Sequence, residues 1–250
     1  MKNVLKSSEP EELQNYKKRY STQFRRWNNL KQSRDTLTSI RSTLISDQKG
    51  LCAYCEMSIY QKPFSVEHFF PCEQSTREEN HDLNWQNMLA ICIPPGGVED
   101  DSLPNAQLPH SSPCCGKAKD NFIPDGRLLN PLQLPTQRLF RFSSADGEIL
   151  PDESGCERSG IPIEYAQFTI HKLGLNVDRL KSRRLAVIDE IIKELDSRDD
   201  GINDRTLLDK QVASEYFDNR KDNYPRFFTT IRWVLDEGAE KHLLEISYSG

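Results

Sequence analysis

Six of the seven cysteines fall within 64 consecutive positions, and this clustering limits the possible folds more than any other feature of the sequence. The six are Cys52, Cys55, Cys72, Cys92, Cys114 and Cys115, whereas Cys156 lies apart. The odd total argues against a disulfide framework, and the first residues lack the apolar stretch of a secretion signal. We therefore expect a cytoplasmic protein whose cysteines serve metal binding or thiol chemistry. Cys72 and Cys156 are interpreted as free thiols.

The spacing of the first pair is typical of zinc sites. Cys52-Ala-Tyr-Cys55 is a CxxC motif, in which two thiolates can bind one tetrahedral zinc ion. A complete site needs a second pair, and the candidates are Cys92 with either Cys114 or Cys115. Two other interpretations stay open: a redox dithiol, which normally sits in a βαβ unit that is not evident here, and cysteines that are simply buried.

Helical periodicity precedes the cysteine-rich stretch. Residues 9–49 are predicted to form a helical arm whose apolar face contains Leu30, Leu37, Ile40 and Leu44. Ser8 and Glu11 are expected to form a capping box around Pro10, and Gly50 to end the helix. The arm therefore leads directly into the CxxC motif.

The periodicity disappears between residues 51 and 131 and then returns. The segment 93–113 is loop-like throughout, so we expect metal to hold this stretch together. Residues 138–150 are predicted to form a hairpin. We then expect a helix that Asn176 caps, followed by two more helices over 204–219 and 225–246. The predicted fold is α+β, with a helical arm at 1–50, a zinc-bound core at 51–131 and a hairpin with helices at 132–250.

Composition and charge narrow the classes of function. No stretch approaches the roughly 18 apolar residues of a membrane span, and 36% hydrophobic residues are enough for a folded core. The formal net charge of −5 argues against nonspecific coating of nucleic acid. However, residues 1–51 carry 11 basic against 5 acidic side chains, whereas residues 52–125 carry 4 against 11. A basic arm thus precedes an acidic core, although a merely solvated helix face would look the same.

A short β-prone run between the cysteine pairs places a carboxylate beside an imidazole. Glu67 and His68 precede Pro71, and because neighbours on a strand face opposite sides, they share a site only if the strand ends or bends there. A lone histidine in such a run is usually structural. Asn87 lies five residues before Cys92, and Lys119 lies four residues after Cys115.

Taken together, these motifs resemble the HNH endonucleases, and more closely the HNH proteins associated with bacterial retrons and with Septu-type anti-phage operons. The resemblance covers roughly residues 40–185. It rests on Gly-Leu-Cys-Ala-Tyr-Cys-Glu at 50–56, Glu-His-Phe-Phe-Pro at 67–71, Trp-Gln-Asn-Met-Leu at 85–89, Cys-Gly-Lys-Ala-Lys at 115–119 and Ala-Gln-Phe-Thr-Ile-His-Lys-Leu-Gly-Leu-Asn at 166–176.

The resemblance implies a zinc-stabilised ββα-metal core and a role for each matching residue. His68 takes the place of the general base that activates water for attack on a phosphodiester, which suits an imidazole with a pKa near 6.5. Glu67 takes the place of a ligand to a catalytic divalent ion, normally Mg²⁺. Asn87 takes the place of the residue that orients the histidine through the loop backbone.

The sequence departs from this family at the third HNH position. Gly116 stands there and has no side chain to bind a metal, so either water completes the coordination of Mg²⁺ or Asp120 or Asn121 substitutes. The family spacing also implies Cys115, rather than Cys114, as the fourth zinc ligand.

Both lysines of this motif have two possible interpretations. Lys117 and Lys119 either contact phosphate or are simply exposed to solvent.

Two functional hypotheses from different classes follow. The first is a nuclease that acts on nucleic acid, most naturally DNA, in anti-phage defence. The resemblance implies that an SMC- or ABC-like ATPase of the same operon controls it, and that a reverse transcriptase and its msDNA accompany it in retrons. The second is a zinc-stabilised adaptor that binds nucleic acid or a partner and has lost catalysis; Gly116 favours it. A thiol oxidoreductase is a third, weaker interpretation.

Overall fold

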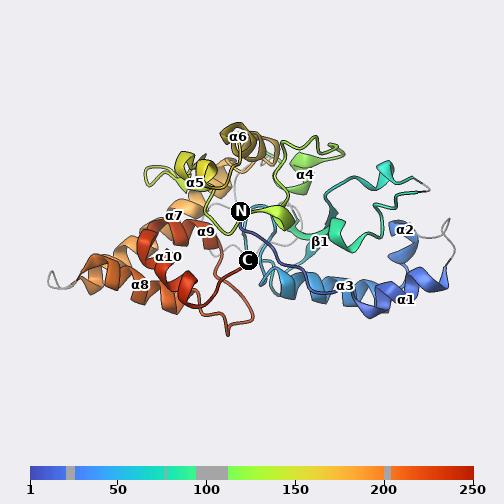
Figure 1. The fold of residues 1–250 in the computed structure, drawn as a ribbon, viewed down its shortest axis with the longest axis horizontal. Coiled ribbons are helices and arrows are strands. Elements are labelled where there is room, and N and C mark those ends of the chain that lie inside the picture. The colour runs from blue at the N-terminus through green and yellow to red at the C-terminus, as the bar shows by residue number, and fades with distance from the viewer. Residues whose placement is uncertain (21–25, 77, 94–111, 200–203) are drawn as a thin grey trace.

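A computed structural model describes residues 1–20, 26–76, 78–93, 112–199 and 204–250 of the chain. The molecule is elongated, with α1 to α3 at one end, the helices α7 to α10 at the other, and β1, α4 and α6 between them (Figure 1). Both termini lie near the middle, where the Asn3 side chain donates a hydrogen bond to the Ser249 carbonyl at 2.9 Å. In the described part of the chain, no helix combines the length and the apolar character required to cross a membrane.

The N-terminal arm is helical but is not one continuous helix. It contains α1 (Glu11–Arg19), α2 (Trp27–Leu30) and α3 (Arg34–Asp47), and α1 packs against α3. Because the chain turns back between α1 and α3, the apolar faces of these two helices pack against each other. A single long helix would leave its apolar face without a packing partner. The capping box is also wrong, because Pro10 occupies the cap position of α1 and no side chain caps it.

The first hairpin follows the arm. Strands β1 (Phe64–His68) and β2 (Met88–Cys92) pair antiparallel, with Phe64 opposite Cys92 and His68 opposite Met88. Two 3₁₀ turns, η2 (Cys72–Gln74) and η3 (Trp85–Asn87), lie in the long connection between them. Beyond β2 comes the short helix α4 (Gly116–Lys119). Of the predicted loop 93–113, residues 94–111 lie outside the described part of the chain.

The second hairpin forms where the sequence predicted it. After the 3₁₀ turn η4 (Pro131–Gln133), β3 (Phe140–Phe142) pairs with β4 (Ile149–Pro151). Gly147 in the connecting turn has a φ of +73°, and a Cβ there would lie 2.1 Å from the Lys181 carbonyl oxygen. Only glycine therefore lets this turn pack against the following helices.

The C-terminal part is built from helices. They are α5 (Glu153–Arg158), α6 (Ile163–Lys172), α7 (Asp178–Arg198), α8 (Arg205–Tyr216), α9 (Phe228–Val234) and α10 (Asp236–Glu245). The predicted last helix is thus divided at Leu235. Asn176 does not cap α7; its side chain instead accepts a hydrogen bond from the Ile149 amide at 2.9 Å and so fixes β4.

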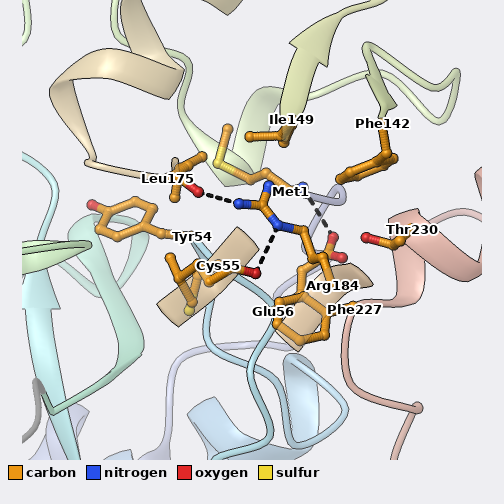
Figure 2. A pocket seen from close by; sticks show the side chains of 11 residues that line it. Met1, Tyr54, Cys55, Glu56, Phe142, Ile149, Leu175, Arg184, Phe227 and Thr230 are labelled. Carbon is orange, nitrogen blue, oxygen red and sulfur yellow. Dashed lines mark hydrogen bonds and ion pairs between the residues drawn. The ribbon is translucent and has the colours of Figure 1, made fainter. Parts of the chain in front are cut away.

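Glu56, which follows the CxxC motif, contacts the N-terminal Met1 (Figure 2) and Thr229 of α9. The buried Glu56 carboxylate accepts hydrogen bonds from the Thr229 amide, at 2.8 Å, and from the Thr229 hydroxyl. It also pairs with the Met1 ammonium at 3.1 Å. Beside it, the buried Arg184 guanidinium donates to the carbonyls of Leu175 and Leu180. The cysteine region and the C-terminal helices are thus in direct contact, and the three-part division stays a prediction.

Candidate functional site

Four cysteines converge although they lie up to 63 positions apart. Cys52 and Cys55 sit in the turn after α3, Cys92 ends β2, and Cys115 precedes α4; all four sulfurs lie within 4.8 Å of one another. The Sγ–Sγ distances are 3.9 Å for Cys52–Cys115, 3.6 Å for Cys55–Cys92 and 3.7 Å for Cys92–Cys115. Four thiols, rather than two, at one point favour a metal site over a redox dithiol.

The structure distinguishes the two adjacent cysteines that spacing alone left open. Cys115 belongs to the group of four, whereas Cys114 lies beside it with its sulfur 3.5 Å from that of Cys115. The Arg179 guanidinium donates to the Cys114 sulfur at 2.7 Å. Hydrogen bonds from Cys115 and Cys92, together with this arginine, lower the pKa of the Cys114 thiol to about 4.

The four-cysteine group is suited to a thiophilic cation. Burial acts to raise the pKa of Cys52, but hydrogen bonds from Cys115, Cys55 and Cys92 outweigh it and hold that pKa well below its usual range. A thiolate is the form that binds metal. In contrast, hydrogen bonds from neighbouring thiols raise the pKa of Cys55, Cys92 and Cys115. The donor set and its convergence therefore carry the fit to a metal ion such as zinc.

His68 ends β1 and is fixed by a backbone carbonyl. Its Nε2 lies 2.8 Å from the Asp82 carbonyl oxygen. Since a carbonyl only accepts hydrogen bonds, the proton belongs on Nε2 of the neutral ring, which leaves a lone pair on Nδ1. Burial lowers the pKa of His68. The side chain is therefore held as a neutral base with one defined acceptor nitrogen.

The Asn87 side chain stabilises the loop between β1 and β2, which contains Asp82. Its side chain accepts from the Phe70 amide at 2.7 Å and donates to the carbonyls of Phe70 and His81, both at 2.9 Å. The link from Asn87 to His68 thus runs through His81 and the neighbouring Asp82. The role of Asn87 in orienting the histidine stays a prediction.

The Asp82 side chain provides a second anchor, which sequence reasoning missed. Its carboxylate pairs with Arg26 at 3.1 Å and accepts from the Trp27 amide at 2.9 Å. The Trp27 ring lies edge-on to the His68 ring, with centroids 4.9 Å apart. No local pattern signals this contact, because it joins α2 to a connection more than fifty positions later.

Glu67 faces the opposite side of β1 from His68, towards α4. Its Oε1 lies 3.0 Å from the Lys119 Nζ, and the Lys119 side chain is 2% exposed. Burial raises the pKa of Glu67, and the charge of Lys119 opposes that rise. Solvent exposure, one of the two interpretations of Lys119, is therefore wrong, because this side chain is buried and its ammonium pairs with Glu67. Lys117 is exposed.

Gly116 explains how Glu67 and α4 approach so closely. A Cβ at this position would lie 2.7 Å from Glu67 Oε2 and 2.3 Å from Ile91 Cδ1. Any side chain at this position would therefore clash with Ile91 and Glu67, and only glycine lets α4 pack this closely against β1.

The structure does not assemble a larger donor set around that carboxylate. Asp120 is exposed, with a φ of +50°. Within the described ranges, the four cysteines are the only convergent group of three or more His, Cys, Asp or Glu side chains. The assignment of Glu67 and Asp120 to a catalytic ion stays a prediction.

Comparison with known proteins gives one informative relative. No family model matches the chain. A protein of Escherichia coli named "Retron Ec83 putative HNH endonuclease" is 32% identical over 161 residues, which is 58% of this chain and 62% of the relative. The chain thus covers less than two thirds of that relative. Over this region, the protein is similar to an HNH endonuclease of a retron.

Proposed function

We propose that this protein is a metal-dependent HNH endonuclease that hydrolyses phosphodiester bonds, with DNA as its substrate. The arrangement of His68 carries the proposal: a neutral imidazole with Nε2 bound to the Asp82 carbonyl and Nδ1 available as a base. It lies at the end of a hairpin whose other strand contributes Cys92 to the four-cysteine group. Similarity to the retron protein supports the same assignment.

In this mechanism, Nδ1 of His68 accepts a proton from water as the water oxygen attacks phosphorus and the bond to the leaving oxygen breaks. The Asp82 carbonyl stabilises the resulting imidazolium through Nε2–H. Asn87 and the Asp82 side chain keep the loop in place. Glu67, which the resemblance implies as a ligand of Mg²⁺, faces the other side of β1 from His68, so it would hold the ion for this step only if the end of the strand turned. The ion would supply positive charge to the phosphate and the leaving oxygen. Zinc at the four cysteines would be structural.

A nicking assay tests the assignment of His68. His68→Ala is expected to slow the Mg²⁺-dependent nicking of a supercoiled plasmid by roughly 10²- to 10⁴-fold, because the base is lost. His171→Ala removes an exposed histidine on α6 and is the matched control. Equal nicking by the His68 variant and the wild type would refute the proposal, and activity without added Mg²⁺ would refute the metal requirement.

The second candidate is an inactive adaptor, which the state of Glu67 and His68 favours. Glu67 is paired with a buried lysine, and His68 is only 9% exposed. An adaptor would bind nucleic acid or a partner and keep its anti-phage protection after His68→Ala. Loss of protection in this variant, with zinc content and binding unchanged, would exclude the adaptor.

We further propose that the nuclease acts in the cytoplasm as the effector of an anti-phage system, controlled by an SMC- or ABC-like ATPase and accompanied by a reverse transcriptase and its msDNA. The retron name of the relative supports this context. The purified chain should then cleave DNA weakly until the ATPase is added. Strong cleavage by the chain alone, unchanged by the ATPase, would contradict this control.

A further inference from the structure

A groove of about 450 Å³ runs beside β1, between the N-terminal arm and α4. Basic and aromatic side chains from three segments line it together with Glu67: Trp27, Lys31, Arg41, Phe64 and Lys117. Figure 1 shows where these segments meet, at the junction of α2 and α3 with β1. The groove therefore joins the basic arm to the candidate active site.

Positive charges predominate along this groove. Lys31 and Lys117 are exposed, and none of Lys31, Arg41 and Lys117 forms an ion pair within the part of the chain that the structure describes. The acidic lining residue, Glu67, is already paired with Lys119. An anionic occupant would thus meet three cations whose charge no carboxylate of the described residues neutralises.

Aromatic rings accompany these cations. The Arg41 guanidinium lies over the Phe64 ring, 4.0 Å from its centroid, which keeps the charge at the groove wall. Trp27 also lines the groove, and its ring contacts His68. Alternating cations and aromatic rings are typical of surfaces that follow a nucleic-acid backbone and stack its bases.

We propose that this groove binds the sugar–phosphate backbone of the nucleic-acid strand, with Lys31, Arg41 and Lys117 contacting phosphates next to the cleaved bond. The inference rests on the proposed nuclease function and extends it by assigning part of the basic arm to substrate binding. Glu67 and Trp27 both line the groove, and the Trp27 ring contacts the proposed base.

Binding at different salt concentrations tests this assignment. In a His68→Ala background, which prevents cleavage, the variant K31E/R41E/K117E is compared with R141E/R158E/K193E, which changes the same charge at exposed sites outside the groove. The probes are a short fluorescein-labelled single-stranded DNA and the duplex of the same sequence, followed by fluorescence anisotropy without added Mg²⁺. The zinc content and melting temperature of each variant are measured first.

We expect the groove variant to bind one or both probes at least about tenfold more weakly than the control variant. The slope of log K against log salt should also become shallower by about 2 to 3, since roughly 0.7 to 0.9 is lost for each phosphate contact. The double variant K31E/K117E, which leaves Arg41 against Phe64, should show about two thirds of the change in slope. Restoring charge with K31R/R41K/K117R should recover binding.

Equal affinities and slopes for the groove and control variants would overturn the inference. Its failure is distinguishable from failure of the proposed function. If His68→Ala abolishes nicking while both triple variants bind alike, the nuclease assignment stands and the groove assignment falls. If His68→Ala leaves nicking unchanged but the groove variant alone loses binding, the groove stands as a nucleic-acid site and the nuclease mechanism falls.

Discussion

The cysteine region, residues 51–92 and 112–119, and the helical region α7 to α10 share one hydrophobic core but differ in what else holds them together. In the helical region, apolar side chains such as Leu195 and Phe228, both fully buried, pack between helices, and α8 lies along α10. In the cysteine region, a two-stranded hairpin and short turns surround four converging thiols. A two-stranded hairpin is at best marginally stable alone.

Because of this difference, we expect the two regions to respond differently to the substitution of a single residue. Apolar packing is distributed over many contacts, so losing one side chain lowers stability without destroying the fold. A site with four ligands depends on each of them, and its binding free energy is also folding free energy. The cysteine region should therefore fail as a unit, whereas the helical region should weaken in steps.

The largest expected effect comes from removing one of the four converging cysteines that we propose to bind zinc. Cys52→Ser and Cys115→Ser should abolish zinc binding and expose the amides of β1 and β2 to hydrogen exchange, since structural zinc in small peptides is worth roughly 10 to 16 kcal/mol. Zinc content is measured by elemental analysis. Cys72→Ser, outside the group, is the control. Cys114→Ser should retain zinc; loss of zinc in this variant alone would reassign the fourth ligand.

A smaller effect is expected from one buried leucine of the helical region. Leu195→Ala should lower the free energy of unfolding by about 2 to 5 kcal/mol, because it leaves a cavity in a packed core. The zinc content should not change. Leu244→Ala removes the same atoms from a side chain that is 82% exposed and should have almost no effect. Loss of zinc in Leu195→Ala would show that the two regions do not respond separately.

Within the cysteine region, Asn87→Ala removes three hydrogen bonds that close the loop between β1 and β2. Stability should fall by about 1 to 3 kcal/mol, because buried backbone groups lose their partners. Nicking should fall further than this loss explains, since the Asp82 carbonyl no longer orients His68. Asn84→Ala removes a single turn-capping bond and is the control. Normal nicking by a folded Asn87→Ala variant would contradict the positioning role.

The smallest effect concerns pH. Because burial lowers the pKa of His68 in the folded state, the unfolded chain takes up its proton first as pH falls through 6.5. His68 should therefore reduce the free energy of unfolding at pH 5 relative to pH 7.5. Urea unfolding of the wild type and of His68→Gln checks this, because protonation of the thiolates affects both equally. An identical pH dependence would mean that the pKa of His68 is not lowered.

Sequence reasoning succeeded where the periodicity or spacing was local. Strand β1, the hairpin β3–β4 and helices α7 and α8 were predicted close to their observed positions. The single helix over residues 9–49 was wrong, because its apolar positions pair α1 with α3 rather than forming one stripe. The predicted cap Asn176 binds β4 instead of capping α7, a contact that no local pattern encodes.

By itself, the sequence determined the residue types of the site: four cysteines with zinc spacing, a histidine at a strand end and an asparagine before the second strand. These follow from short motifs, in which neighbouring positions fix the local geometry. Only the tertiary structure decided that Cys115 joins the group, that Lys119 is buried against Glu67, and that Trp27 contacts His68. Each of these contacts joins segments that are distant in the sequence and meet only when the chain folds. Burial in the folded core then determines the orientation of these side chains and the charge of those that ionise.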